Sequence, residues 1–346
     1  MKKLLLNLLI VLVVSGILIA VMFTNQSADE TVRILKSLDY VYISIAFACV
    51  VINWVFGALI IKAIKKGMIG KQRDPGGNFT AFMASEFAAA VTPLASGSQP
   101  ALVYTLSKKG LDTGVATSIA VIRSFIYLVT ELALAIIGFL FMRKYLVQHI
   151  PHFYAIFIPT IVICLLIVIL FLAFLEKGKL ANKIVGLFLL LVKRFFPKRY
   201  DKIEKAAAES LISFKEGVSV FKTKPWFWFF AFLFQTTEFL FLYLVPVFML
   251  RAIEGTFDNA LPLMVCTCIC MIVMAYVPTP GTIGGAEAFA RLLITPFFVS
   301  SPALPVIFIW RVLTYYAKIP FGGICFMVAL RGKGAKGKKI KARRTV

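Results

Sequence analysis

Acidic residues and metal-ligand clusters are scarce in this sequence. Only 16 Asp and Glu face 38 Lys and Arg over 346 residues, and the two histidines are His149 and His152. The six cysteines all lie in apolar stretches. Cys266, Cys268 and Cys270 are two residues apart, so on a helix their side chains point about 200° away from one another. This spacing predicts packing residues rather than a metal site. Because the sequence also has no G-x-x-x-x-G-K-[ST] phosphate loop, we expect neither a cofactor nor ATP.

Polar residues are also few. Hydrophobic residues make up 60% of the chain, and the mean hydropathy is +0.89. A soluble domain is nearer half apolar, so the formal charge of +22 does not indicate a soluble nucleic-acid binder. In a membrane protein, an excess of Lys and Arg predicts cytoplasmic loops beside anionic lipid. The composition therefore predicts an all-α polytopic integral membrane protein.

Long apolar stretches predict about seven or eight spans. The first stretch, residues 1–23, begins with two lysines and has no A-x-A-like cleavage site, so we interpret it as a retained span and not a signal peptide. The other stretches are each near the 20 or so residues that cross a bilayer. They are 40–64, 113–142, 153–175, 226–250, 261–277 and 303–330.

The basic residues between these stretches predict the orientation. They concentrate after residue 61, in the segment 176–224 and in the tail 331–346, which has eight Lys and Arg and no acid. The loops at about 24–39, 143–152 and 251–260 are less basic. The positive-inside rule then places both termini in the cytoplasm of a bacterial-type cell. Segment 176–224 contains an amphipathic pattern that predicts a helix on the cytoplasmic membrane surface, and it is too short for a typical enzyme domain.

Proline and glycine interrupt two further apolar segments, so neither is predicted to be a simple span. TPLASGSQP has basic flanks on both sides, which predicts a re-entrant helical hairpin entering from the cytoplasm. VPTPGTIGG, near the last span, should be reached from outside. The alternative is that proline and glycine only kink ordinary spans. The predicted break residues are Thr92, Pro93, Gly97, Pro280, Gly281, Gly284 and Gly285.

The two interrupted segments share the pattern T-P-x-x-x-G-x-x-x-A, and each is followed about 30 residues later by R-x-x-x-Y. Because their predicted orientations are opposite, they suggest an inverted repeat, an arrangement typical of transporters. The first repeat is expected at about 40–142 and the second at about 226–330, inside one membrane domain that spans 1–330.

The charged residues inside the apolar stretches suit an anionic headgroup. Helix breaks expose backbone N–H groups that favour phosphate, and an arginine fork can hold phosphate through two bonds. The predicted headgroup ligands are Arg123, Tyr127, Arg311, Tyr315 and Glu287. The alternative role of the arginines is internal Arg–Glu pairing that holds the bundle together.

The charged residues inside the apolar stretches also have other predicted roles. Glu287 and Glu238 are candidates to neutralise the arginines. Arg291 and Lys318 have the length to snorkel to the interface. The buried carboxylates Glu86, Glu131 and Glu238 are candidate proton sites.

Two pairs of motifs carry a family resemblance. TPLASGSQPALVYTLSKKG with IRSFIYLVTE, and VPTPGTIGGAEAF with WRVLTYY, resemble the flippase-like membrane region of lysylphosphatidylglycerol synthases, the multiple peptide resistance factor family, and its standalone members. The resemblance covers nearly the whole chain. It implies translocation of an aminoacylated phospholipid that a separate C-terminal domain makes from aminoacyl-tRNA and phosphatidylglycerol. Since 16 residues follow the last apolar stretch, we expect that domain to be missing.

Three functions stay open on the sequence. The first is translocation or binding of an anionic or aminoacylated phospholipid. The second is the family's phosphatidylglycerol lysyltransferase activity, which we do not expect of this chain alone. The third is a scaffold for a separate synthase. The candidate lipids are phosphatidylglycerol, its lysyl derivative and a polyprenyl-phosphate lipid. A homo-oligomer is also open, and no specific nucleic-acid partner is expected.

Overall fold

The computed structural model describes residues 28–70, 77–150, 152–177, 225–279 and 281–331, together with isolated residues between 186 and 219. In these parts of the chain all regular elements are helices, which confirms the predicted all-α class. Several predicted features lie outside the described residues. They are the first span at 1–23, Pro280, nearly all of the amphipathic segment 176–224 and the tail after Arg331.

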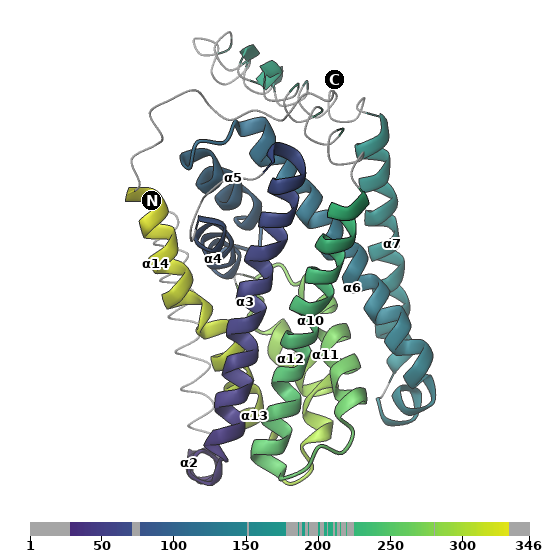
Figure 1. Cartoon of the computed structure of the whole chain (residues 1–346). Coiled ribbons are helices and arrows are strands. Elements are labelled where there is room, and N and C mark those ends of the chain that lie inside the picture. The colour runs from purple at the N-terminus through teal and green to yellow at the C-terminus, as the bar shows by residue number, and fades with distance from the viewer. Residues whose placement is uncertain are drawn as a thin grey trace.

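Two 30-residue helices form the centre of the bundle (Figure 1). They are α3 (Tyr40–Ile69) and α10 (Pro225–Glu254), and they run antiparallel, because the backbone N–H of Asp39, at the start of α3, donates to the carbonyl of Ala252, near the end of α10, over 3.1 Å. Farther along, Asn53 Nδ2 donates to the carbonyl of Glu238 over 2.9 Å. A 30-residue helix is about 45 Å long, enough to cross a bilayer core. The short α2 (Ala28–Ser37) precedes α3.

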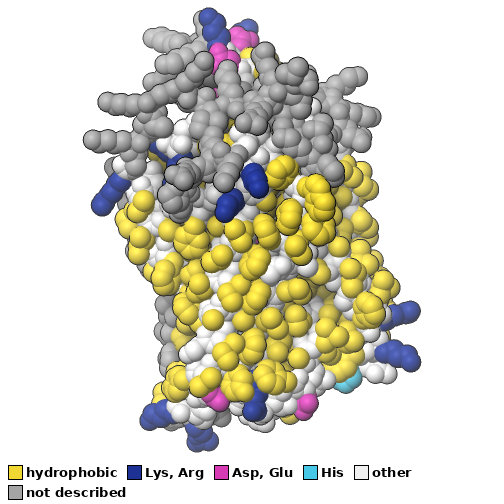
Figure 2. Space-filling model, viewed as in Figure 1, with side chains coloured by type: hydrophobic (Ala, Val, Ile, Leu, Met, Phe, Trp, Pro, Cys, Tyr) yellow, Lys and Arg dark blue, Asp and Glu magenta, His cyan; other side chains and the backbone are white. Residues whose placement is uncertain are grey.

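In the described parts of the chain, four helical stretches are long and apolar enough to cross a membrane: Tyr40–Ile69, Thr113–His149, Trp226–Glu254 and Ala303–Arg331. Shorter apolar stretches occupy Phe153–Ile169 and Ala260–Met274. The predicted total of seven or eight spans therefore stays a prediction. Figure 2 shows hydrophobic side chains over the middle of the visible face, with Lys and Arg toward its two ends, as expected for a protein surrounded by lipid.

The first interrupted segment forms a helical hairpin. Its arms are α4 (Gly77–Ala90) and α5 (Ser98–Lys108), joined by residues 91–97, which we call the first connection. The hydroxyl of Thr92 donates to the carbonyl of Ala88 over 2.7 Å and accepts from the N–H of Gly97 over 2.8 Å. One side chain thus supplies partners for backbone groups left free by the end of α4 and the start of α5.

The second interrupted segment also forms a helical hairpin. Its arms are α11 (Ala260–Met274) and α12 (Gly285–Leu293), joined by residues 275–284, which we call the second connection. The prediction of a span at 261–277 was wrong in its extent. The helix has 15 residues and ends at Met274, because the following segment, with Pro278 and Gly281, leaves the helical path.

The two connections share an unusual backbone conformation. Leu94 and Ala95 have φ angles of 52° and 51°, and Gly281 and Thr282 have φ angles of 66° and 56°. These are corresponding positions in the shared T-P-x-x-x-G pattern. Left-handed conformations cost non-glycine residues about 1–2 kcal/mol each. Three of the four residues are not glycine, so both connections hold locally strained backbone at matching places.

Long helices complete each half of the bundle. In the first half, α6 (Thr113–His149) is capped by Asp112, whose Oδ1 accepts from the N–H of Gly114 over 2.9 Å. In the second half, α12 is followed by the 3-10 turn η2 (Thr295–Phe297), α13 (Ala303–Arg311), the π-helical turn η3 (Val312–Tyr316) and α14 (Lys318–Arg331). Helix α14 packs against α4 and α6 against α11, so each long helix contacts the hairpin of the other half.

The hairpins occupy different halves of the molecule. In Figure 1, α4 and α5 lie in the upper half, whereas α11, α12 and α13 lie in the lower half. Helix α7 (Phe153–Lys177) follows α6 and packs along it. The two hairpins therefore lie toward opposite ends of the bundle.

Candidate functional site

A cavity of about 500 Å³ lies between the two connections. Thr92, Leu94, Ala95 and Ser96 line it from the first connection, and Ala275, Gly281 and Thr282 line it from the second. Its charged lining consists of Glu86, Arg123, Arg311 and Lys318. Arg311 is paired with Glu287, so Arg123 and Lys318 against Glu86 leave a formal excess of one positive charge, which suits an anion.

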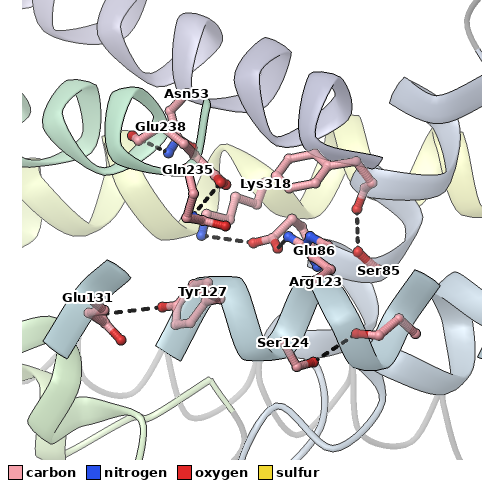
Figure 3. Close-up of polar contacts among 12 residues, drawn as sticks. Asn53, Ser85, Glu86, Arg123, Ser124, Tyr127, Glu131, Gln235, Glu238 and Lys318 are labelled. Atoms are coloured by element: carbon pink, nitrogen blue, oxygen red, sulfur yellow. Dashed lines mark hydrogen bonds and ion pairs between the residues drawn. The ribbon is translucent and has the colours of Figure 1, made fainter. Parts of the chain in front are cut away.

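Glu86 connects two of these cations (Figure 3). Its Oε1 lies 3.5 Å from Arg123 Nη2, and its Oε2 lies 3.3 Å from Lys318 Nζ. Glu86 comes from α4, Arg123 from α6 and Lys318 from α14, so the three charges join three helices. Lys318, interpreted from the sequence as a snorkelling residue, is instead directed to a carboxylate inside the bundle.

Arg123 has donor capacity to spare. The residue is 5% exposed, yet its Nε has no hydrogen-bond partner among the described residues, and the 3.5 Å contact with Glu86 is long for a charge-assisted bond. The guanidinium also lies 5.0 Å from the centre of the Phe82 ring. A buried guanidinium that lines a cavity and is held by one long bond is a natural place for an acceptor to bind.

Arg311 is held much more closely. Its Nη2 donates to the carbonyl of Gly281 over 2.9 Å, and its Nε lies 3.1 Å from Glu287 Oε1. Its guanidinium carbon lies 4.1 Å from the centre of the Tyr315 ring. Glu287 Oε2 in turn accepts from the N–H of Gly284 over 2.7 Å, where α12 begins. Arg311 and Glu287 therefore fix the second connection and the first turn of the helix that follows it.

The two tyrosines of the R-x-x-x-Y motifs use their hydroxyls differently. Tyr315 donates to the carbonyl of Ala90 over 2.9 Å, at the end of α4, and so ties one half of the molecule to the other. Tyr127 lines the cavity and donates to Glu131 over 3.4 Å. The hydroxyl of Tyr315 is already engaged within the protein, whereas that of Tyr127 connects the cavity to a buried carboxylate.

Two carboxylates lie behind the cavity. Glu131 and Glu238 are 3% and 5% exposed. Glu238 Oε2 accepts from Gln235 Nε2 over 2.7 Å, so Glu86, rather than Glu238, is the ion-pair partner of Arg123. Arg291, the other predicted snorkelling residue, is exposed on α12.

The predicted break residues lie at the hairpin connections, apart from Pro280, which is outside the described residues. Thr92, Pro93 and Gly97 lie in the first connection. Gly281 and Gly284 lie in the second, and Gly285 begins α12. A Cβ atom on Gly281 would collide with the Tyr315 hydroxyl, so the close approach of ring and backbone depends on glycine there.

Sequence reasoning missed several residues of this site. Four further residues line the cavity: Gln99, Ser124, Trp310 and Thr314. Their spacing from the predicted site residues was the one feature of the sequence that could have indicated them. Thr314 and Lys318 follow Arg311 at intervals that place all three on one helical face, so Lys318 could have been assigned to the cavity.

An apolar groove of about 690 Å³ adjoins the cavity. It runs between α5 and α6, with Phe171 of α7 on its wall, and Gln99 and Ser124 line both the groove and the cavity. Pro100, Val103, Ala120 and Val121 make most of its surface apolar. The charged cavity and the groove together form a site with a polar end and an apolar extension.

Metal ligation has no support in the described parts of the chain, where no three His, Cys, Asp or Glu side chains gather. Cys266, Cys268 and Cys270 are buried as free thiols on α11.

Comparison with known proteins identifies the family. Residues 8–322 match the model of the lysylphosphatidylglycerol synthase TM region. A UPF0104 membrane protein of Archaeoglobus fulgidus is 24% identical over 329 residues, covering 90% of this chain and 94% of the relative. No solved structure matches the chain significantly. A match over so much of the chain means that this membrane protein belongs to the family of the lysylphosphatidylglycerol synthase transmembrane region.

Proposed function

We propose that this protein binds the anionic headgroup of a phospholipid in the cavity between its two connections and moves it across the cytoplasmic membrane. The observation that carries the proposal is Arg123, a buried guanidinium on the wall of a cavity with excess positive charge, held among the described residues by one long hydrogen bond. Arg123 is the primary headgroup ligand, with Lys318 and Tyr127 beside it. Arg311, Tyr315 and Glu287 serve mainly to hold the second connection.

The chemistry of the cavity favours an anion with several acceptor oxygens. An arginine fork can donate two parallel bonds to phosphate, and lysine adds a point charge. A headgroup phosphate between Arg123 and Lys318 would compete with Glu86, which now contacts both. The weak geometry of the Arg123–Glu86 contact makes that exchange of partners inexpensive.

The adjoining groove favours a lipid over a free anion. A phospholipid needs a polar site for its headgroup and an apolar surface for its acyl chains, and the shared residues Gln99 and Ser124 make the two continuous here. A soluble phosphate would use only the charged part. Phosphatidylglycerol and its lysyl derivative are the proposed cargo because the synthases of this family act on them.

The paired hairpins favour movement over static binding. We propose that they are re-entrant elements of an inverted repeat, entering the membrane from opposite faces, with the basic ends of the helices in the cytoplasm. The antiparallel α3 and α10, the matching φ angles and the reciprocal packing of α6 and α14 support this. In such transporters the site lies where the breaks meet and opens alternately to the two sides.

Reconstitution tests this function. The protein is placed in liposomes that contain fluorescent phosphatidylglycerol, and a reductant added outside bleaches the outer leaflet. Wild type should accelerate loss of the inner-leaflet signal. Arg123→Gln should slow exchange by about tenfold to a hundredfold, because a hydrogen bond to a charged group contributes about 1.5–3 kcal/mol.

Arg143→Gln is the matched control, since Arg143 lies on the same helix, outside the cavity, and bonds to the Tyr154 hydroxyl. It should exchange lipid like wild type. Wild-type liposomes that exchange lipid no faster than empty ones contradict the proposal. Formation of lysyl-lipid on addition of lysyl-tRNA would instead support the transferase alternative.

A further inference from the structure

Two carboxylates behind the cavity have no part in holding the headgroup. Glu131 on α6 and Glu238 on α10 are almost fully buried, and their side chains accept from neutral donors, the Tyr127 hydroxyl and the Gln235 amide. Within the described parts of the chain, neither lies within 4 Å of a cationic side chain. An ionised carboxylate in such a place is costly unless a nearby positive charge compensates it.

Both carboxylates lie near side chains that line the cavity, Glu131 beside Tyr127 and Glu238 near Lys318 (Figure 3). Tyr127 lines the cavity and contacts Glu131, and Arg123 and Lys318 act on Glu238. The ionisable groups facing Glu131 are Tyr127, Glu238, Tyr243, Cys164, Cys268 and Tyr276. Those facing Glu238 are Arg123, Glu86, Lys318 and Glu131. The tyrosines and cysteines are ordinarily neutral at pH 7, so the charge balance lies with the two cations and the three carboxylates.

Binding of an anionic headgroup in the cavity changes this charge balance. When the cavity is empty, Glu86 is the carboxylate among the described residues that touches Arg123 and Lys318, and the remaining positive excess favours a second negative charge on Glu238, on which both cations act. When an anionic headgroup binds, it supplies that negative charge itself. The buried carboxylate then faces an anion without a free cation, and its protonated form is favoured.

We propose that the Glu131–Glu238 pair takes up one proton when the anionic lipid enters the cavity and releases it when the lipid leaves, so that lipid and proton cross the membrane together. The inference rests on the proposed function. The proton comes from water on the side of loading, forms an O–H bond on one carboxylate, and returns to water on the other side as that bond breaks. One anion and one proton move together, so no net charge crosses.

A steady-state leaflet distribution tests this coupling. Proteoliposomes with fluorescent phosphatidylglycerol are prepared at pH 7.5 inside and 6.5 outside, with the membrane potential clamped to zero. One-to-one coupling should enrich the lipid in the leaflet on the alkaline side, by at most about tenfold for one pH unit. Equal pH on both sides should give equal leaflets, as should protein-free liposomes.

Glutamine variants test whether Glu131 and Glu238 carry the coupled proton. Glutamine resembles a protonated carboxyl, so Glu131→Gln with Glu238→Gln should still exchange lipid but leave the leaflets equal under the same gradient. Glu254→Gln, on the same helix as Glu238 but at its end beside Ser300, should keep the wild-type enrichment. A thermal melt of each purified variant checks that it is folded.

The outcomes separate this inference from the function on which it rests. Absence of wild-type exchange at any pH overturns the proposed function. Wild-type exchange with equal leaflets under the pH gradient overturns only the coupling. Enrichment that persists in the double glutamine variant overturns the assignment to these two carboxylates.

Discussion

The two connections share a backbone conformation but differ in what their arginines bind. Arg311 contacts the Gly281 carbonyl, Glu287 and the face of Tyr315. Arg123, at the corresponding place in the other half, makes one hydrogen bond among the described residues, a long one of 3.5 Å to Glu86. The same R-x-x-x-Y spacing thus supports two roles. Arg311 has several close contacts at a strained connection, whereas Arg123 is the residue that we propose binds the ligand.

The largest expected effect is a difference in stability between variants of the two arginines. Arg311→Gln should lower the free energy of unfolding by about 3–5 kcal/mol, because the substitution removes the buried guanidinium with its hydrogen bond to the Gly281 carbonyl, its ion pair with the partly exposed Glu287 and its contact with the Tyr315 ring. Arg123→Gln should lower it much less, since its one ion-pair contact among the described residues is 3.5 Å long and Glu86 keeps Lys318. Thermal unfolding of both variants in the same detergent measures the difference. Equal losses of stability would show that the two arginines have the same role.

A second, smaller effect concerns the strained residues. Gly281→Ala should destabilise the protein by about 1–3 kcal/mol, because φ is 66° there and a Cβ collides with the Tyr315 hydroxyl. Leu94→Gly, at the corresponding position, should change stability by less than about 1 kcal/mol, since relief of left-handed strain offsets the flexibility of glycine. The same unfolding assay applies. A Gly281→Ala variant as stable as wild type is incompatible with the close packing of this connection.

The smallest expected effect is a difference in stability between variants of Thr92 and Thr279, the threonines of the shared T-P pattern. Thr92 bridges the carbonyl of Ala88 and the N–H of Gly97, whereas Thr279 donates only to the carbonyl of Ile283. Valine at either position has nearly the same shape without the hydroxyl. Thr92→Val should therefore cost about 1–2 kcal/mol, and Thr279→Val about 1 kcal/mol or less. A larger loss for Thr279→Val would contradict the bonding described for the first connection.

The sequence predicted the helical framework well, for physical reasons. Long apolar runs must be helical in a membrane, and proline with glycine interrupts them, so the breaks near Pro93 and Gly281 were recognisable. The observed hairpins end within a few residues of the predicted interruptions. The extent of 261–277 was overestimated because hydrophobicity continues past Met274, where the helix itself ends.

The site was harder to predict, because spacing does not encode partners. Leu94 and Ala95 adopt left-handed backbone without the glycine that would signal it. Nothing in the R-x-x-x-Y motif distinguishes Arg311, beside Glu287, from Arg123, beside Glu86. That difference depends on which helices pack together. The same packing brings Lys318, interpreted from the sequence as a snorkelling residue, into contact with Glu86 on the cavity wall. The predicted headgroup roles of Arg123, Tyr127, Arg311, Tyr315 and Glu287 stay predictions.

The most direct test of the account is an experimental structure of the protein in nanodiscs that contain phosphatidylglycerol. We expect headgroup density in the cavity, with a phosphate oxygen within hydrogen-bonding distance of the Arg123 guanidinium and an acyl chain along the groove between α5 and α6. Lipid density confined to the outer surface of the bundle, with Arg123 bonded only to protein, would contradict the account.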